Sequence, residues 1–239
     1  MKIDKHTSID PLGAQPLGGG PKRRKRFLWI ILAVLAALLL WVGSDLLVPR
    51  RADIRRFDPR EIAQLDTVMW RSYYERRSGD LFLQLAELMR LQFHFPLLRS
   101  NHVAAYAAKA AFIFKDGHDR ADYERALPYL ECYFQEIHDI SDRPFNVRRA
   151  ARLELEWWII HRERAKHGYE DLARAVAEAA AELYQVPADK LMDYGRYRAD
   201  AMKVRDTRTV ASGVTEEDWR VIESDLQASW QSLWKAIQP

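Results

Sequence analysis

The sequence has a single cysteine, Cys132, among its 239 residues. One thiol excludes a disulfide within the chain and any zinc or iron–sulfur site that needs several thiolates from one chain. Glycine and proline are also scarce, at ten residues each, while 48% of the residues are hydrophobic. These figures exclude a collagenous, low-complexity or wholly disordered protein, and they suit one folded domain with an appendage.

Recognisable catalytic motifs are absent as well. The sequence has no glycine-rich phosphate loop, no His-Glu-x-x-His pair and no Gly-x-Ser-x-Gly elbow. It also lacks the Glu-x-x-His pairs that di-metal helical bundles use. We therefore predict no cofactor and no metal site, and the sequence favours a non-catalytic protein without excluding an enzyme.

Basic residues are concentrated at the N-terminus. Residues 1–51 hold nine Lys or Arg against three Asp or Glu, whereas residues 52–239 hold 28 against 31. The larger part of the chain is slightly acidic. Nucleic acid is therefore not a predicted partner.

A long apolar run, residues 27–48, follows the basic cluster KRRKR. Its first 17 residues, FLWIILAVLAALLLWVG, carry no charge, and the run is long enough to span the hydrocarbon core as a helix. Trp29 and Trp41 lie near its ends, where indole rings favour the membrane interface. We predict a disordered basic tail at residues 1–26, a transmembrane helix at 27–48 and a linker at 49–57.

The positive charges also predict the orientation. The tighter cluster precedes the apolar run, which favours a cytoplasmic N-terminus and an extracytoplasmic domain, periplasmic in a Gram-negative cell. The alternative is a signal peptide cleaved near Ser44, which would release a secreted protein. We favour the uncleaved anchor, because the apolar run is longer than that of a typical signal peptide.

The remaining residues, 58–239, read as an all-α domain. Asp58, Pro59 and Glu61 form a complete helix start, with a cap, a first-turn proline and a carboxylate at the capping-box position. Proline, glycine and capping residues then divide the domain into about eight helices. We expect them near residues 58–77, 80–93, 100–116, 120–140, 142–166, 169–184, 187–208 and 215–237, with a kink at Pro128.

Some of these helices recur in a weak internal pattern. The segment AAYAAKAAFIF at residues 104–114, followed by YERAL at 123–127, loosely resembles a tetratricopeptide helical hairpin. Similar residues return 46 positions later, which is longer than the repeat of about 34 residues in that family. The resemblance implies stacked αα-hairpins and carries no function.

Candidate site residues lie on the predicted helices 142–166 and 187–208. Glu154, Trp158 and His161 share one stripe of a helix that is apolar around most of its circumference. Arg198 and Arg205 share the apolar face of the other helix with Tyr194. These residues and Glu156 could form an ion-pair network or a ligand or metal pocket.

The network is the interpretation that we favour, over an anion pocket lined by the two arginines and Tyr194. In it, Glu154 or Glu156 pairs with Arg198 or Arg205, since arginine makes bidentate pairs and tolerates partial burial. Cutting a buried pair is costly, so Glu154→Ala should lower the stability of the domain by about 3 kcal/mol.

Aromatic residues supply the candidate partner surface. The sequence has eight tryptophans, and most should pack in the core. Where Trp70, Tyr74, Trp230 or Trp234 remains exposed, it would mark a protein-binding patch. The leading hypothesis is a membrane-anchored helical scaffold or accessory subunit that binds another protein. The alternative is an enzyme or ligand binder with its site around Glu154, His161, Arg198 and Arg205.

Overall fold

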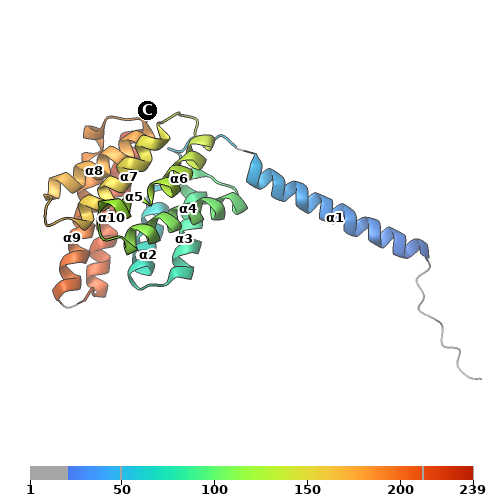
Figure 1. The fold of residues 1–239 in the computed structure, drawn as a ribbon, viewed down its shortest axis with the longest axis horizontal. Helices are drawn as coiled ribbons and strands as arrows, with labels where there is room; N and C mark the ends of the chain where they lie inside the picture. The colour runs from blue at the N-terminus through green and yellow to red at the C-terminus, as the bar shows by residue number, and fades with distance from the viewer. Residues whose placement is uncertain (1–20, 49, 212, 239) are drawn as a thin grey trace, which may run out of the picture. The chain divides into compact units, whose positions relative to one another are not determined.

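The computed structural model describes residues 21–48, 50–211 and 213–238, and the regular elements of these ranges are helices (Figure 1). The all-α class is therefore confirmed. The helices are α1 (Pro21–Leu47), α2 (Pro59–Tyr74), α3 (Ser78–Phe93), α4 (Leu97–Asp116), α5 (Arg120–Glu124), α6 (Leu127–Ile140), α7 (Val147–Arg162), α8 (Tyr169–Tyr184), the 3₁₀ turn η1 (Ala188–Leu191), α9 (Met192–Ala211) and α10 (Glu216–Ile237).

The chain divides into two compact units, residues 1–44 and 45–239. Most of the predicted disordered tail lies outside the described residues, but residues 21–26 belong to α1. The stretch Arg24–Leu47 is long and apolar enough to cross a membrane, a test that signal sequences also pass.

Side-chain caps begin several helices of the second unit. The Asp58 carboxylate accepts a hydrogen bond from a first-turn N–H of α2 at 2.8 Å, and Asn146 does the same for α7 at 3.0 Å. Thr215 and Asp218 form a reciprocal capping box at α10. These contacts satisfy N–H groups that have no partner inside the helix, which is why the helices begin there.

Prolines account for three departures from the predicted helix bounds. The expected helix 120–140 is two helices, because Pro128 occupies the first turn of α6 instead of kinking a continuous helix. Helix α4 begins at Leu97, directly after Pro96, and not at Ser100. Pro187 begins a 3₁₀ turn, and the α-helix that follows it starts at Met192.

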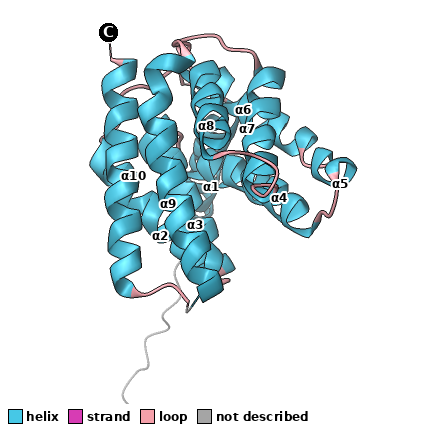
Figure 2. Cartoon of the chain, turned by 90° about the vertical axis from the view of Figure 1, so that its left-hand side faces the viewer, coloured by secondary structure: helices cyan, strands magenta, loops and turns pink. Residues whose placement is uncertain are grey.

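The long helices of the second unit form a closed ring. Each packs against the next in the chain, from α2 through α3, α4, α6, α7, α8 and α9 to α10, and α10 packs against α2. Most connections are short, so neighbouring helices run antiparallel, as α9 and α10 do in Figure 2. The predicted stack of tetratricopeptide-like hairpins is not confirmed, because these contacts are those of a ring.

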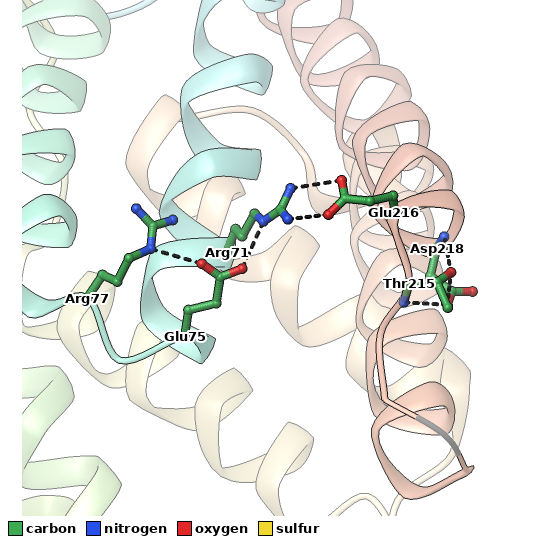
Figure 3. Close-up of polar contacts among 6 residues, drawn as sticks. All are labelled: Arg71, Glu75, Arg77, Thr215, Glu216 and Asp218. Carbon is green, nitrogen blue, oxygen red and sulfur yellow. Dashed lines mark hydrogen bonds and ion pairs between the residues drawn. The ribbon is translucent and has the colours of Figure 1, made fainter.

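Polar contacts mark the seam where α10 meets α2 (Figure 3). Arg71 of α2 donates from Nη1 to Glu216 Oε2 of α10 at 3.0 Å, and its guanidinium lies 5.7 Å from the Trp219 ring. Glu75 accepts from Arg71 at 2.8 Å and from Arg77 at 2.9 Å. These ion pairs are exposed, and exposed ion pairs add little stability.

The ring has two distinct ends. The α2–α3 and α9–α10 connections lie at one end, which we call the mouth end, and the C-terminus lies at the other, the floor end (Figure 1). The segment before α2 packs at the floor end, where the Ala52 N–H donates to the Ile140 carbonyl at 2.7 Å. Asp45 also caps α4 there, accepting from the Leu98 N–H at 2.6 Å.

Candidate functional site

The ring encloses a cavity of about 620 Å³, and every long helix from α2 to α10 contributes to its wall. At the mouth end, the lining residues Tyr73 and Phe112 are 38% and 42% exposed. Near the floor end, lining residues such as Gln92 and Tyr184 are buried. The cavity therefore opens at the mouth end.

Phe57 packs behind the wall of the cavity near the floor end. Its ring packs edge-on against Trp230 at 5.8 Å and lies 6.5 Å from the ring of Tyr184. Both of these partners line the cavity, while Phe57 belongs to the segment that precedes α2. The segment that carries the chain into the ring thus also packs behind the floor of the cavity.

Asp66 and Arg198 form a buried ion pair at about half the height of the wall. Arg198 Nη1 donates to Asp66 Oδ2 at 2.6 Å, and Trp230 Nε1 donates to the same oxygen at 2.7 Å. The guanidinium also lies 5.6–5.7 Å from the ring centroids of Trp70, Tyr194 and Trp230. A carboxylate and three aromatic rings hold this cation in place.

Glu154, at half the length of α7, is a second carboxylate in the wall. Trp158 Nε1 donates to its Oε1 at 3.0 Å, but within the described residues no ion pair reaches it. Burial raises the pKa of Glu154, and hydrogen bonding from Trp157 and Trp158 and the charge of Arg198 only partly offset that effect. The folded protein therefore favours a neutral carboxyl group at this position more than water does.

Tyrosine hydroxyls complete the polar part of the wall. Tyr184 accepts a hydrogen bond from Gln92 Nε2 at 2.8 Å. Burial raises the pKa of Tyr133 and Tyr184, and it raises the pKa of Tyr194 to about 12. The Glu154 charge also raises the pKa of Tyr133 and Tyr194, so the three groups share one region of the cavity. These phenols stay protonated and can donate hydrogen bonds to a ligand.

Charged residues at the mouth form a separate network around Asp206. His161 Nε2 lies 2.9 Å from Asp206 Oδ2, Arg164 lies 3.3 Å from the same oxygen, and Arg205 lies 3.2 Å from Oδ1. Burial would raise the pKa of Asp206, but hydrogen bonding from His161 and the nearby positive charges lower it. Arg205 also stacks 3.3 Å from the ring centroid of Tyr74.

The structure brings together four of the five residues predicted for the site. Glu154, His161, Arg198 and Arg205 line the one cavity. Glu156 points elsewhere and pairs with Arg120 at 2.7 Å on an exposed surface. In the described part of the chain, no cluster of His, Cys, Asp or Glu is placed to hold a metal ion.

The predicted pairing of these residues needs correction. Arg198 binds Asp66 and Arg205 binds Asp206, so neither guanidinium pairs with Glu154 or Glu156. For the alternative, an anion pocket, Arg198 is already paired with Asp66, while Arg205 shares Asp206 with Arg164 and His161. Sequence reasoning missed Asp66, although its spacing of four residues from Ile62 and from Trp70 puts it on the inner face of α2.

The four aromatic residues of the predicted partner surface fall into two groups. Trp70 and Tyr74 are half-buried and line the cavity, and Trp230, 5% exposed, is part of its wall. Trp234 lies outside it, beside a shallow depression at the floor end with Arg55 and His94. Three of the four aromatic residues therefore line the cavity.

The fold and the site together define a class: a closed ring of antiparallel helices around an aromatic cavity of ligand size, preceded by a long apolar helix. Comparison of the chain with protein-family models, curated proteins and solved structures finds no match.

Proposed function

We propose that this protein is a membrane-anchored ligand-binding protein and that its ligand occupies the cavity inside the helical ring. The observation that carries the proposal is the enclosure itself, because one cavity gathers side chains from every long helix of the unit. Its volume of about 620 Å³ is within the range of small-molecule sites, roughly 300–1,000 Å³. We assign binding and no reaction.

The composition of the wall supports the same proposal. Tryptophan, phenylalanine, leucine and alanine side chains form most of it, and a few polar groups converge at half height. Such a wall suits an apolar or aromatic ligand with one polar group, since apolar area supplies affinity and the polar group fixes orientation. The ligand-binding alternative is thereby preferred over the scaffold hypothesis.

A pair of alanine substitutions on α4 tests whether the cavity is occupied. Ala111 lines the cavity, whereas Ala105 is exposed on the same helix. Ala111→Trp should fill part of the cavity, and Ala105→Trp makes the same change on the outside. An organic extract of the full chain, purified from native membranes, should contain a small molecule that Ala111→Trp loses and Ala105→Trp keeps. Identical extracts from all three proteins would contradict the proposal.

The proposed location rests on α1 and on the flanking charges. We propose that residues 27–48 remain as an uncleaved anchor, with the N-terminus in the cytoplasm and the helical ring outside it. Within the helical unit, the chain enters the ring at the floor end, opposite the mouth of the cavity.

Two measurements test this location. A reporter that is active only in the cytoplasm, fused after the last residue, should remain inactive. N-terminal sequencing of the purified protein should find residues upstream of the apolar run. A mature protein beginning at Asp45, or an active reporter, would contradict the anchor or the orientation, respectively.

A protein partner is the second candidate, and the exposed aromatic rim favours it. Phe112 is 42% exposed at the mouth, where an apolar segment of another protein could insert. This role would retain the hypothesis of a scaffold or accessory subunit. Phe112→Ala should then weaken co-purification of that partner, whereas Val221→Ala, equally exposed on α10, should leave it unchanged. Equal effects of both substitutions would contradict this role.

A further inference from the structure

The two carboxylates at half height have similar surroundings but different partners. Asp66 accepts from an indole N–H, that of Trp230, and from the guanidinium of Arg198. Glu154 also accepts from an indole N–H, that of Trp158, at 3.0 Å. Within the described residues, however, Glu154 has no cation in the position that Arg198 takes beside Asp66.

We infer that the cavity binds an organic cation, an ammonium or amidinium group on an apolar or aromatic body, and that Glu154 is its counter-ion. The inference rests on the proposed ligand-binding function and names the chemical class of the ligand. The aromatic cage around Arg198 shows how this wall already holds a cation, with a carboxylate and ring faces together.

Aromatic and hydroxyl groups near Glu154 fit such a cation. Trp157, Trp158 and Tyr133 line the same cavity, and the Glu154 charge is felt at the hydroxyls of Tyr133 and Tyr194. Ring faces attract a desolvated cation, and recognition of substituted ammonium groups by aromatic residues follows this principle. The apolar remainder of the ligand would extend along the alanine and leucine side chains toward the mouth.

The other charged side chains of the wall already have polar partners of their own. Arg198 is held by Asp66, and Arg164 and Arg205 share Asp206 at the mouth. Arg162, also near the mouth, donates to backbone carbonyls and stacks on Phe114 at 4.5 Å. Glu154 is therefore the carboxylate of the wall that a bound cation would neutralise. A ligand ammonium would supply the favourable charge interaction that burial otherwise removes.

Three probes of nearly equal size separate charge from apolar contact. Phenylbutylamine, phenylbutanol and phenylbutyrate share one aromatic body and carry a cationic, a neutral and an anionic head group. Each is titrated by calorimetry into the full chain in lipid nanodiscs, with empty nanodiscs as the blank. We expect the amine to bind at least about tenfold more tightly than the alcohol, the difference that a charge-assisted hydrogen bond gives.

Glu154→Gln tests the role of the carboxylate, and Glu156→Gln is the matched control. Both residues lie on α7, but Glu156 is exposed and pairs with Arg120. Glu154→Gln should lower the affinity for phenylbutylamine to that for phenylbutanol. Because the amide keeps the volume of the side chain, alcohol binding should be retained, which also shows that the cavity is intact. Glu156→Gln should change neither affinity.

The outcomes distinguish this inference from the function on which it rests. If wild type binds the alcohol as tightly as the amine, binds phenylbutyrate most tightly, or keeps its amine affinity in Glu154→Gln, the cavity binds ligands but the cation inference is wrong. If none of the three probes binds, both the cation inference and the proposed ligand-binding function are contradicted.

Discussion

Asp66, which is buried, and Glu154, which is half-buried, show how much a carboxylate in the cavity wall depends on its partner. Asp66 has a guanidinium at 2.6 Å and an indole N–H at 2.7 Å. Glu154 has indole N–H donors but no guanidinium in an ion pair, and its pKa is raised mainly by burial. An acid pKa that is raised on folding means that the folded chain holds the proton more tightly. Stability then falls as the pH rises above the ordinary pKa of the group.

Glu154→Gln should therefore stabilise the protein near neutral pH. We expect an increase in the free energy of unfolding of about 1 kcal/mol, because the neutral amide carries no charge for burial to penalise. Near about pH 4, where the carboxyl group is protonated in both states, the difference should shrink toward zero. Urea unfolding of both proteins at the two pH values measures it. A loss of stability near neutral pH would contradict this expectation and would favour the ion pair of Glu154 that the sequence predicted.

The opposite result is expected at Asp66. Asp66→Asn removes the charge that neutralises buried Arg198, and breaking a buried pair costs about 3–5 kcal/mol. Glu156→Gln breaks the exposed pair with Arg120, which should cost less than about 1 kcal/mol. Thermal unfolding of both variants gives the comparison. Equal effects would mean that the Asp66–Arg198 pair contributes no more than an exposed one.

At the scale of the elements, some helix ends were predictable because their signals are local, although prolines moved others. Helix α8 begins and ends at the predicted residues, and Asp58 caps the helix that it was expected to cap. The partners of the site residues were not predictable. Glu154 was correctly expected to lie toward the interior, but its partner depends on which helices become neighbours, and Asp66 lies 132 residues from Arg198. No local sequence pattern predicts a contact between residues so far apart in the chain, and none predicts the contact between α10 and α2.

Close helix approach gives a test of the α8–α9 contact. A Cβ atom added to Gly195 would overlap the backbone carbonyl of Ala173, which has no side-chain freedom to move away. Gly195→Ala should therefore destabilise the protein toward the upper end of the 1–3 kcal/mol that is usual for overpacking, about 3 kcal/mol. Gly79→Ala, where nothing lies within 4 Å, should be neutral or slightly stabilising. Urea unfolding measures both variants. Equal free energies of unfolding would contradict the close contact between α8 and α9.

For the helical unit as a whole, closure of the ring makes the terminal helix necessary for the fold, which it is not in an open stack of hairpins. In a stack of hairpins each repeat contacts only its neighbours, so a terminal helix can be removed while the rest stays folded. Here α10 packs against both α9 and α2, and its Trp230 reaches the Asp66–Arg198 pair. The helices therefore depend on one another around the whole ring.

Removal of α10 should accordingly unfold the entire unit. A chain that ends before Thr215 should lose its cooperative thermal transition, as followed by circular dichroism, whereas the full chain should show one transition. A truncated chain that still unfolds cooperatively with most of its helical signal would indicate an open array.

The central claim is that the cavity inside the ring binds a ligand, and photolabelling tests it most directly. The full chain in nanodiscs is irradiated with a phenylalkylamine that carries a diazirine, and the labelled peptides are mapped by mass spectrometry. We predict labels on cavity-lining stretches of α6, α7 and α9, around Tyr133, Trp157 and Tyr194, and we predict that excess phenylbutylamine removes them. Labels confined to α1 or to the outer faces of the ring, without competition, would contradict the account.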